Sequence, residues 1–200
     1  GTLLGNILFK RYLQDARRIK NPLADSERSR FREVVGIFSK YADQYEFDVL
    51  AVAAQAYQES KLDHDTRSHR GAIGIMQLLP STAADPNVGI KNISKLEDNI
   101  HAGIKYLAFL RDRYFSDPQI TAKNQLAFSW AAYNAGPANV RRMRNKAKQM
   151  GLDPNVWFGN VELAAARTVG REPVRYVRNI FKYYVAYALV RDKLLSQTDS

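Results

Sequence analysis

Apolar residues along the chain recur mostly every three or four positions, and the alternation typical of strands is scarce. Residues 3–12 predict a short first helix, which Asn21-Pro22 would end. Its apolar stripe consists of Leu3, Leu4, Ile7, Leu8 and Tyr12. Residues 26–45 predict a second helix with one buried face. The inward positions of that face are Phe31, Val34, Val35 and Phe38.

Residues 49–60 form an apolar stretch that predicts a central, buried helix, because nearly every face of it is apolar. Asp48 is the expected N-cap, and Glu59 stands at the other end. Residues 61–79 predict loops and a small hairpin, with Gly71 and Gly74 supplying special backbone angles. A carboxyl group between a buried helix and such a loop can have a raised pKa and act as a general acid. The alternative is an ordinary helix-terminal acid in water.

The second half of the chain also predicts helices. Ser94 and Glu97 have capping-box spacing before a periodic segment that reaches Leu110. Residues 121–134 predict a helix that stops at Gly136, and Pro137 starts the next, which ends at Gly151. A last long helix is predicted over residues 172–195. The predicted fold is a mainly α single domain with one irregular loop region beside Glu59.

Composition limits the class of protein. With 46% hydrophobic and 25% charged residues, the 200-residue chain is expected to fold as one globular domain. No run is long and apolar enough for a transmembrane helix. Zero cysteines exclude disulfides and thiolate chemistry without assigning a compartment. Neither a cleavable signal nor a lipid-accepting cysteine is visible near Gly1, so a targeting segment is expected to have been removed or to belong to a longer parent.

The net charge of +10 indicates a surface that attracts polyanions, such as nucleic acid or a peptidoglycan strand with its carboxylates. The densest basic run lies between residues 141 and 148. It consists of Arg141, Arg142, Arg144, Lys146 and Lys148. A solvated helix face is the favoured interpretation of this run. No zinc-finger, RNP-like or phosphate-loop pattern supports nucleic-acid binding.

Four blocks occur in order: Glu59-Ser60, the segment from Ser68 to Ala83 with its two glycines, Ala131–Gly136 with the sequence AAYNAG, and Glu172–Val177 with the sequence EPVRYV. Together they resemble the catalytic domain of lytic transglycosylases, which cleave the glycan strands of peptidoglycan. The resemblance covers roughly residues 32–190 and implies a lysozyme-like α-helical fold.

The resemblance also implies a mechanism. Glycoside cleavage usually employs two carboxyl groups, but residues 67–79 contain no Asp or Glu. Asp63 and Asp65 are expected to cap or solvate the turn after the helix. Glu59 would protonate the glycosidic oxygen while the substrate's N-acetyl group stabilises the cationic centre. Glu59 would then deprotonate the muramyl 6-hydroxyl, giving a 1,6-anhydro ring without water.

Three loop residues take roles from the resemblance. Ser68 and Gln77 would hydrogen-bond sugar N-acetyl or hydroxyl groups, and Met76 would press on a sugar face. The alternatives are that Gln77 satisfies buried backbone groups and that Met76 belongs to the core. Ser60 is expected to support the turn or to hydrogen-bond the carboxyl of Glu59.

Three residues from later blocks complete the implied site. Tyr133 would approach Glu59 and the reacting sugar, Asn134 would hold its loop, and Glu172 would point into the cleft. Asn134 has the same backbone alternative as Gln77.

Metal and cofactor chemistry is not indicated. The histidines His64, His69 and His101 lack metal-ligand spacing and are expected at the surface, and the sequence suggests neither a metal nor an organic cofactor.

The segments Gly170–Tyr187 and Asp153–Phe158 look most like those of the membrane-bound lytic transglycosylase F group, in which a solute-binding-like domain precedes the catalytic domain. Residues 1–25 would then be a connecting segment and residues 26–200 the catalytic domain. The implied partner is the peptidoglycan strand, and the implied location is the periplasm, at the outer membrane in the full-length protein. Two alternatives stay open: a hydrolytic muramidase of goose-lysozyme type, and a non-catalytic glycan-binding domain. A nucleic-acid-binding module depends on charge alone and comes last.

Overall fold

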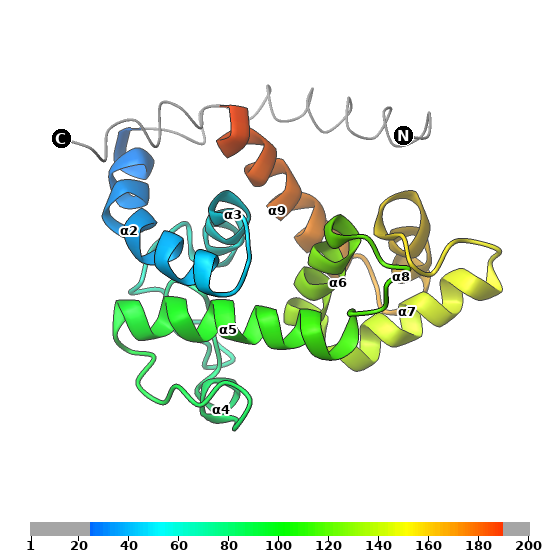
Figure 1. The fold of residues 1–200 in the computed structure, drawn as a ribbon, viewed down its shortest axis with the longest axis horizontal. Helices are drawn as coiled ribbons and strands as arrows, with labels where there is room; N and C mark the ends of the chain where they lie inside the picture. Colours follow the sequence, from blue (N-terminus) through cyan, green and yellow to red (C-terminus); the bar gives the residue numbers. More distant parts are fainter. Residues whose placement is uncertain (1–24, 190–200) are drawn as a thin grey trace. The chain divides into compact units, whose positions relative to one another are not determined.

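The computed structural model describes residues 25–189, which fall into two compact units. The first unit comprises residues 25–106 and 180–189, and the second comprises residues 107–179. Every regular element in this range is a helix (Figure 1), and the prediction of a mainly α fold is confirmed. The predicted helix over residues 3–12 lies outside the described residues, as does nearly all of the predicted connecting segment.

The helices that the sequence predicted in this range begin close to their predicted positions, whereas the short helices over residues 80–84 and 162–168 were not predicted. The helices are α2 (Asp25–Gln44), α3 (Val49–Ser60), α4 (Pro80–Ala84), α5 (Leu96–Tyr114), α6 (Ala122–Ala135), α7 (Pro137–Gln149), α8 (Glu162–Thr168) and α9 (Glu172–Leu189). A kinked turn, η1 (Trp157–Val161), precedes α8. Both α5 and α9 contribute residues to each unit.

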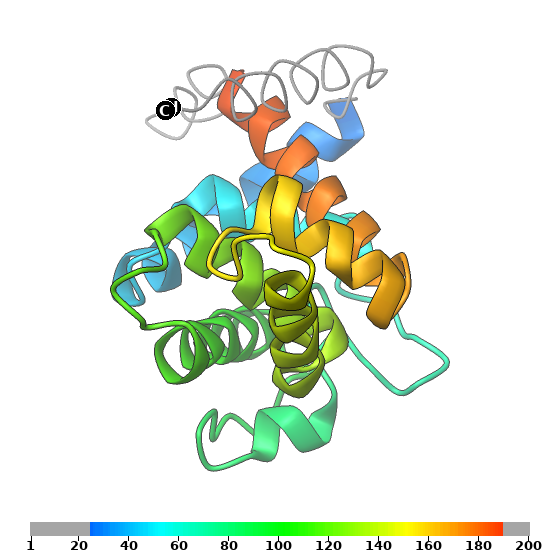
Figure 2. The same cartoon turned by 90° about the vertical axis from the view of Figure 1, so that its right-hand side faces the viewer.

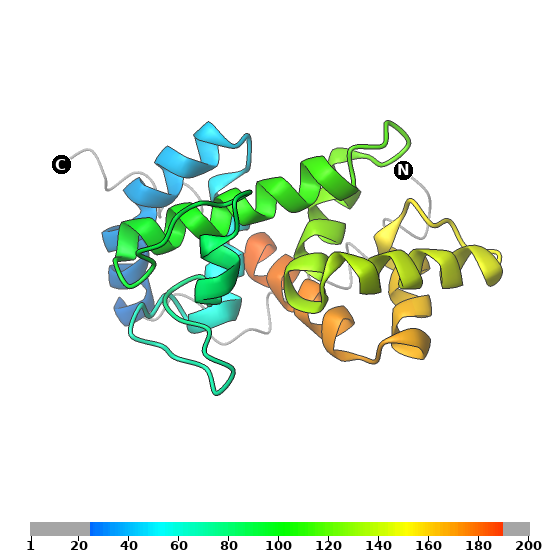
Figure 3. The same ribbon diagram turned by 90° about the horizontal axis from the view of Figure 1, so that it is seen from below.

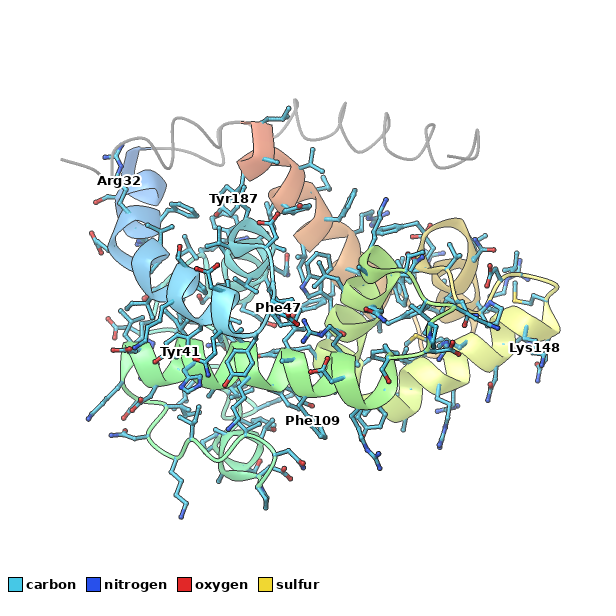
Figure 4. All side chains as sticks on the ribbon, in the orientation of Figure 1. Arg32, Tyr41, Phe47, Phe109, Lys148 and Tyr187 are labelled. Atoms are coloured by element: carbon cyan, nitrogen blue, oxygen red, sulfur yellow. The ribbon has the colours of Figure 1, made fainter. Side chains whose placement is uncertain are left out.

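In the first unit, α2 packs on α3, and the four predicted inward residues of α2 are all buried. The ring of Phe31 lies 5.4 Å from the ring of Tyr187 on α9, so the described end of α9 joins the same core (Figure 4). On another part of α2, Tyr41 points toward α5 and stacks on His101, with ring centroids 4.1 Å apart. The short helix α4 follows the loop over residues 61–79 and lies at the bottom of Figure 2.

The predicted capping box at the start of α5 is wrong. The helix begins at Leu96, and the carbonyl oxygen of Lys95 accepts the first backbone bond, from Asn99. The Ser94 hydroxyl donates to Asn92 instead. The carboxylate of Glu97 accepts bonds from Lys40 and Tyr41 of α2, at 2.7 and 2.9 Å. A contact between two helices has therefore replaced the local cap.

In the second unit, α7 and α8 lie side by side, and α7 also packs on α6 (Figure 3). The predicted break between α6 and α7 is confirmed: Gly136 has a φ of 84°, and Pro137 starts α7. Phe128 lies at the centre of this unit, with ring centroids 5.5 Å from Phe115 and 5.9 Å from Trp157.

The basic helix α7 has one structural arginine. The guanidinium of Arg144 donates to the carbonyl oxygen of Pro154 and to Asn155, and it lies 5.3 Å from the centre of the Phe128 ring. Burial is the main cause that lowers the pKa of Arg144 from its ordinary value. Grouping Arg144 with the solvated cations of the run was therefore wrong.

Candidate active site

The helix that carries Glu59 is fixed at its start by a local cap. The Asp48 carboxylate accepts a 2.8 Å bond from the amide of Leu50, which confirms the predicted N-cap. All side chains from Leu50 to Tyr57 are buried, so α3 is the central helix that its apolar sequence predicted. Glu59, in the last turn, is half-buried. Glu59 is therefore placed at the end of the buried helix with its side chain only partly shielded from solvent.

A sharp turn follows Glu59. Lys61 and Leu62 both adopt left-handed conformations, with φ values of 58° and 60°. Non-glycine residues pay about 1–2 kcal/mol each for this conformation, so the rest of the unit must hold the turn in place. The Ser60 hydroxyl contributes by donating a 2.8 Å bond to the carbonyl oxygen of Ile75 and by accepting one from the amide of Asp63. This confirms the prediction that Ser60 supports the turn.

Lys61 itself is held between two tyrosine rings. Its ammonium group lies 4.3 Å from the centre of the Tyr57 ring and 4.8 Å from that of Tyr183, and it donates a 3.2 Å bond to the Tyr183 hydroxyl. Arg30 of α2 also donates to the carbonyl oxygen of Lys61, at 3.4 Å. Side chains of α2, α3 and α9 therefore fix the end of α3.

The loop after this turn forms the predicted small hairpin without a regular strand. Antiparallel bridges join Ile73 to Arg67 and to Leu78. The Asp63 carboxylate accepts a bond from the amide of Asp65 at 2.9 Å, so it stabilises the turn, as predicted.

Asn99 of α5, which the sequence did not single out, anchors the loop. Its side-chain oxygen accepts a 2.9 Å bond from the amide of Met76, and its nitrogen donates to the carbonyl oxygens of Ile73 and Ile93 at 3.0 and 2.9 Å. A Cβ at Gly74 would lie 2.3 Å from this amide nitrogen, so only glycine fits there. The sequence could have indicated Asn99, because it is a polar residue on the buried side of a predicted helix.

Gln77 is tied to the backbone of its own loop. Its amide nitrogen donates to the carbonyl oxygens of Thr66 and Gly74 at 3.0 and 2.8 Å, and its φ is 45°. This geometry supports the backbone alternative for the nitrogen. The amide oxygen has no hydrogen-bond partner among residues 25–189, so its contact with a sugar stays a prediction.

Met76 is fully buried and packs against α5, where a Cβ at Gly103 would lie 2.6 Å from the Cβ of Met76. Its side chain has no exposed surface to offer a sugar in this structure, and the core alternative describes it better. Ser68 is exposed, and its hydroxyl accepts a 3.0 Å bond from the amide of Ala72. It shapes the tip of the loop and remains accessible.

The other predicted site residues belong to the second unit, whereas Glu59 belongs to the first. Tyr133 is half-buried in the last turn of α6, Asn134 beside it is exposed, and Glu172 is the exposed first residue of α9. Their approach to Glu59 therefore stays a prediction.

One turn before Glu59, Gln55 is an unpredicted polar residue inside α3. Its side chain is fully buried, and neither its amide oxygen nor its amide nitrogen has a hydrogen-bond partner among the described residues. Positions four residues apart share a helix face, so Gln55 and Glu59 lie on one side of α3. An unpaired amide of this kind is costly for the fold.

The histidine predictions need correction. His69 is exposed, but His64 and His101 are half-buried, because the first joins two backbone segments and the second stacks on Tyr41. The two ring nitrogens of His64 lie 2.7 Å from the carbonyl oxygen of Ser94 and 3.3 Å from the amide nitrogen of Ile75. In the part of the chain that the structure describes, no three His, Asp or Glu side chains gather as metal ligands do.

Glu162 in the second unit is a half-buried acid that the sequence did not single out. Burial raises the pKa of Glu162, while the amide of Gly159, at 2.8 Å from its carboxylate, and the charge of Arg178 oppose this shift. Its bond to Gly159 spans the kink of η1 and indicates a structural role.

Two curated proteins that are similar to this chain have the same name. Membrane-bound lytic murein transglycosylase F of Desulfosudis oleivorans is 39% identical over 170 residues, a match that covers 78% of this chain and 36% of that protein. The protein of the same name from Maricaulis maris is 34% identical over 182 residues. This match covers 84% of this chain and 37% of that protein. The chain spans about a third of the length of these relatives.

Solved structures confirm the predicted lysozyme-like fold. The lytic transglycosylase Slt of Pseudomonas aeruginosa, in an inactive glutamate-to-glutamine mutant, matches with a TM-score of 0.58 and 23% identity over 78% of this chain and 24% of that one. The 70 kDa soluble lytic transglycosylase of Escherichia coli matches with a TM-score of 0.56 and 27% identity. This match covers 82% of this chain and 26% of that one.

The family described as the transglycosylase SLT domain matches residues 36–155, more than half of the chain. The curated relatives also share more than 30% of the aligned residues. The chain therefore belongs to the transglycosylase SLT domain family.

Proposed function

We propose that this chain is a peptidoglycan lytic transglycosylase that cleaves the β-1,4 bond between N-acetylmuramic acid and N-acetylglucosamine. The observation that carries the proposal is Glu59 itself. It is a half-buried acid at the end of a buried helix, and residues 67–79 of the loop that follows contain no Asp or Glu. The names of the relatives, which are lytic murein transglycosylases, support the same activity.

Glu59 performs both proton transfers in this proposal. It first donates its proton to the glycosidic oxygen as the bond from the anomeric carbon to that oxygen breaks, and the substrate's N-acetyl group stabilises the positive charge. The carboxylate of Glu59 then accepts the proton of the muramyl 6-hydroxyl, whose oxygen bonds to the anomeric carbon. The strand is cut without consuming water, and Glu59 recovers its proton. Substrate assistance of this kind replaces the second carboxyl group.

The neighbouring loop supplies binding groups in this proposal. The Ser68 hydroxyl and the amide oxygen of Gln77 hydrogen-bond the sugar, and Met76 supports the loop from the core rather than from the sugar side. Three residues of the second unit keep, in this proposal, the roles that the family resemblance implies for them. These are Tyr133, Asn134 and Glu172.

Product analysis tests the reaction. An intramolecular nucleophile has a large effective-concentration advantage, about 10⁵–10⁸ M in well-oriented cases, so we expect the 6-hydroxyl to win over water. Mass spectrometry of digested sacculi should show muropeptides that lack one water relative to hydrolytic products and have no reducible end. Reducing muramic acid ends that contain oxygen from labelled water would instead indicate a lysozyme-like hydrolase. Binding without any product would indicate a glycan-binding domain.

The cellular setting is also a proposal. None of the described helices is long and apolar enough to cross a membrane. The relatives are named as membrane-bound, and the chain spans about a third of their length. We therefore place the activity in the periplasm, at the outer membrane, in a longer protein with a solute-binding-like domain upstream of this one.

A further inference from the structure

Among the described residues, the positive charge is concentrated in one unit. Residues 107–179 contain twelve Lys or Arg and five Asp or Glu, which gives a net charge of +7. The described residues of the first unit contain eleven Lys or Arg and twelve Asp or Glu, a net charge of −1. The second unit is therefore the part of the described chain that attracts anions.

Helix α7 supplies five of these cations and contains no acidic residue. Arg144 is engaged inside the unit, as described above. The four others form what we call the α7 basic face, and no ion pair of theirs is found within residues 25–189. The members of this face are Arg141, Arg142, Lys146 and Lys148. Lys148 lies near the far end of the helix (Figure 4).

The arrangement does not serve the stability of the helix. Like charges four residues apart, such as Arg142 with Lys146, destabilise an isolated helix by about 0.2–0.5 kcal/mol per pair. Only the cations in the last turn gain from the helix dipole, and Arg141 and Arg142 lie before it. An acidic residue at one of these spacings would have removed the repulsion. The uncompensated charge is thus better explained by an external partner.

The chemistry of the helix selects the kind of partner. The buried residues of α7 are the apolar Val140, Met143 and Ala147. The positions facing out carry no aromatic or long aliphatic side chain that could enter a lipid interface. A partner recognised by charge alone, with several anionic groups along a flexible polymer, fits this surface.

We propose that the α7 basic face binds the stem-peptide carboxylates of the peptidoglycan strand that the enzyme cleaves. This inference depends on the proposed function for the identity of the polymer. Exposed ion pairs contribute about 0.2–1 kcal/mol each and are screened by salt, so the contact should be weak, multiple and salt-dependent.

A charge-reversal experiment tests this inference. The variant Arg141→Glu with Lys148→Glu changes two exposed residues seven positions apart, which share one side of α7. The matched control, Lys91→Glu with Lys95→Glu, changes two exposed lysines of the first unit and alters the net charge equally. For the α7 variant we expect the half-saturating concentration of sacculi to rise roughly 3- to 30-fold at low salt, with an unchanged maximal rate. The control should change much less.

Two further measurements identify the partner. Sacculi with amidated carboxyl groups should bind the wild type as weakly as untreated sacculi bind the α7 variant. Phosphatidylglycerol vesicles and single-stranded DNA are also attracted by charge, but they should show a smaller difference between the variants than sacculi do at physiological salt. Equal losses in the α7 variant and the control, or a loss seen only with vesicles or DNA, would overturn the inference. Failure of the proposed function is distinct, because wild-type protein would then bind sacculi and release no anhydro products.

Discussion

Glu59 is the residue on which the proposed chemistry depends. Glu59→Gln removes the transferable proton and nearly preserves the shape of the side chain. General acid–base catalysis is typically worth about 10²–10⁴-fold, so we expect turnover of sacculi to fall by at least about 100-fold. The melting temperature should stay close to that of the wild type, which separates lost chemistry from lost folding. Retention of more than about a tenth of the wild-type rate would remove Glu59 from its assigned role.

For Gln55 we predict a change in stability, and a favourable one. Its fully buried amide lacks partners among the described residues, and burying an amide unpaired costs about 1–3 kcal/mol in protein mutational data. Gln55→Met keeps the length of the side chain and removes both polar atoms. We expect the free energy of unfolding to rise by about 1–3 kcal/mol, measured by urea denaturation. A loss of stability would mean that the amide has a hydrogen-bond partner in solution.

At the residue scale, the sequence was most successful where local chemistry decides the role. The cap formed by Asp48 and the bond that the Ser60 hydroxyl accepts in the following turn were both predicted. Each bond joins residues only two or three positions apart, so the local sequence is enough to indicate it. The sequence left two roles open for Met76, a sugar contact and a core residue. Its burial depends on Gly103 of another helix, which has no side chain to occupy the same space. Gln77 shows the same limit, since its bonds to Thr66 and Gly74 appear only once the loop has closed.

At the scale of elements, the contact between α2 and α5 contains a titratable group, the imidazole of His101. Burial is the main cause that lowers the pKa of His101 below its ordinary value of 6.5, and the charge of Lys105 adds to it. Lys40 acts in the same direction, and Asp98 and Glu97 oppose the shift. The folded protein therefore binds this proton less readily than the unfolded chain does. Stability should fall as the pH drops from about 6.5 toward the lower pKa of the folded state.

His101→Phe tests this dependence, because it keeps a ring to stack on Tyr41 and removes the titration. It also removes the 2.9 Å contact with the Tyr45 hydroxyl, so the comparison concerns the pH dependence and not the absolute stability. Urea denaturation at pH 8 and pH 5 should show a smaller acid-side loss in the variant. An identical loss in both proteins would assign the pH dependence to other groups.

The ends of the helices show where prediction from local sequence stops. The α6–α7 break was predicted because Gly136 and Pro137 impose it through their own backbones. The cap of α5 was predicted wrongly, since Glu97 has capping-box spacing and yet bonds to Lys40 and Tyr41, more than fifty positions away in the chain. A local preference is lost when a tertiary partner offers a stronger contact.

At the scale of the molecule, the order of four short blocks was enough to predict the fold class. The acid at the end of a buried helix was predicted as well, from the apolar sequence alone. The uneven division of charge was not, because it becomes visible only when the residues are assigned to two units. The net charge of +10 predicted attraction to polyanions without indicating where on the molecule it acts.

The anchoring of the loop by Asn99 has a consequence for the order of folding. The loop has backbone bonds of its own, but the backbone groups of Ile73 and Met76 bond to an amide more than twenty positions later in the chain. The contacts with Asn99 cannot form until that later part of the chain has closed onto the loop, and such closure costs entropy. We therefore expect the loop to take its final conformation only after α5 has docked. A nascent chain that stops before Asn99 would then contain Glu59 without this anchor for the neighbouring loop.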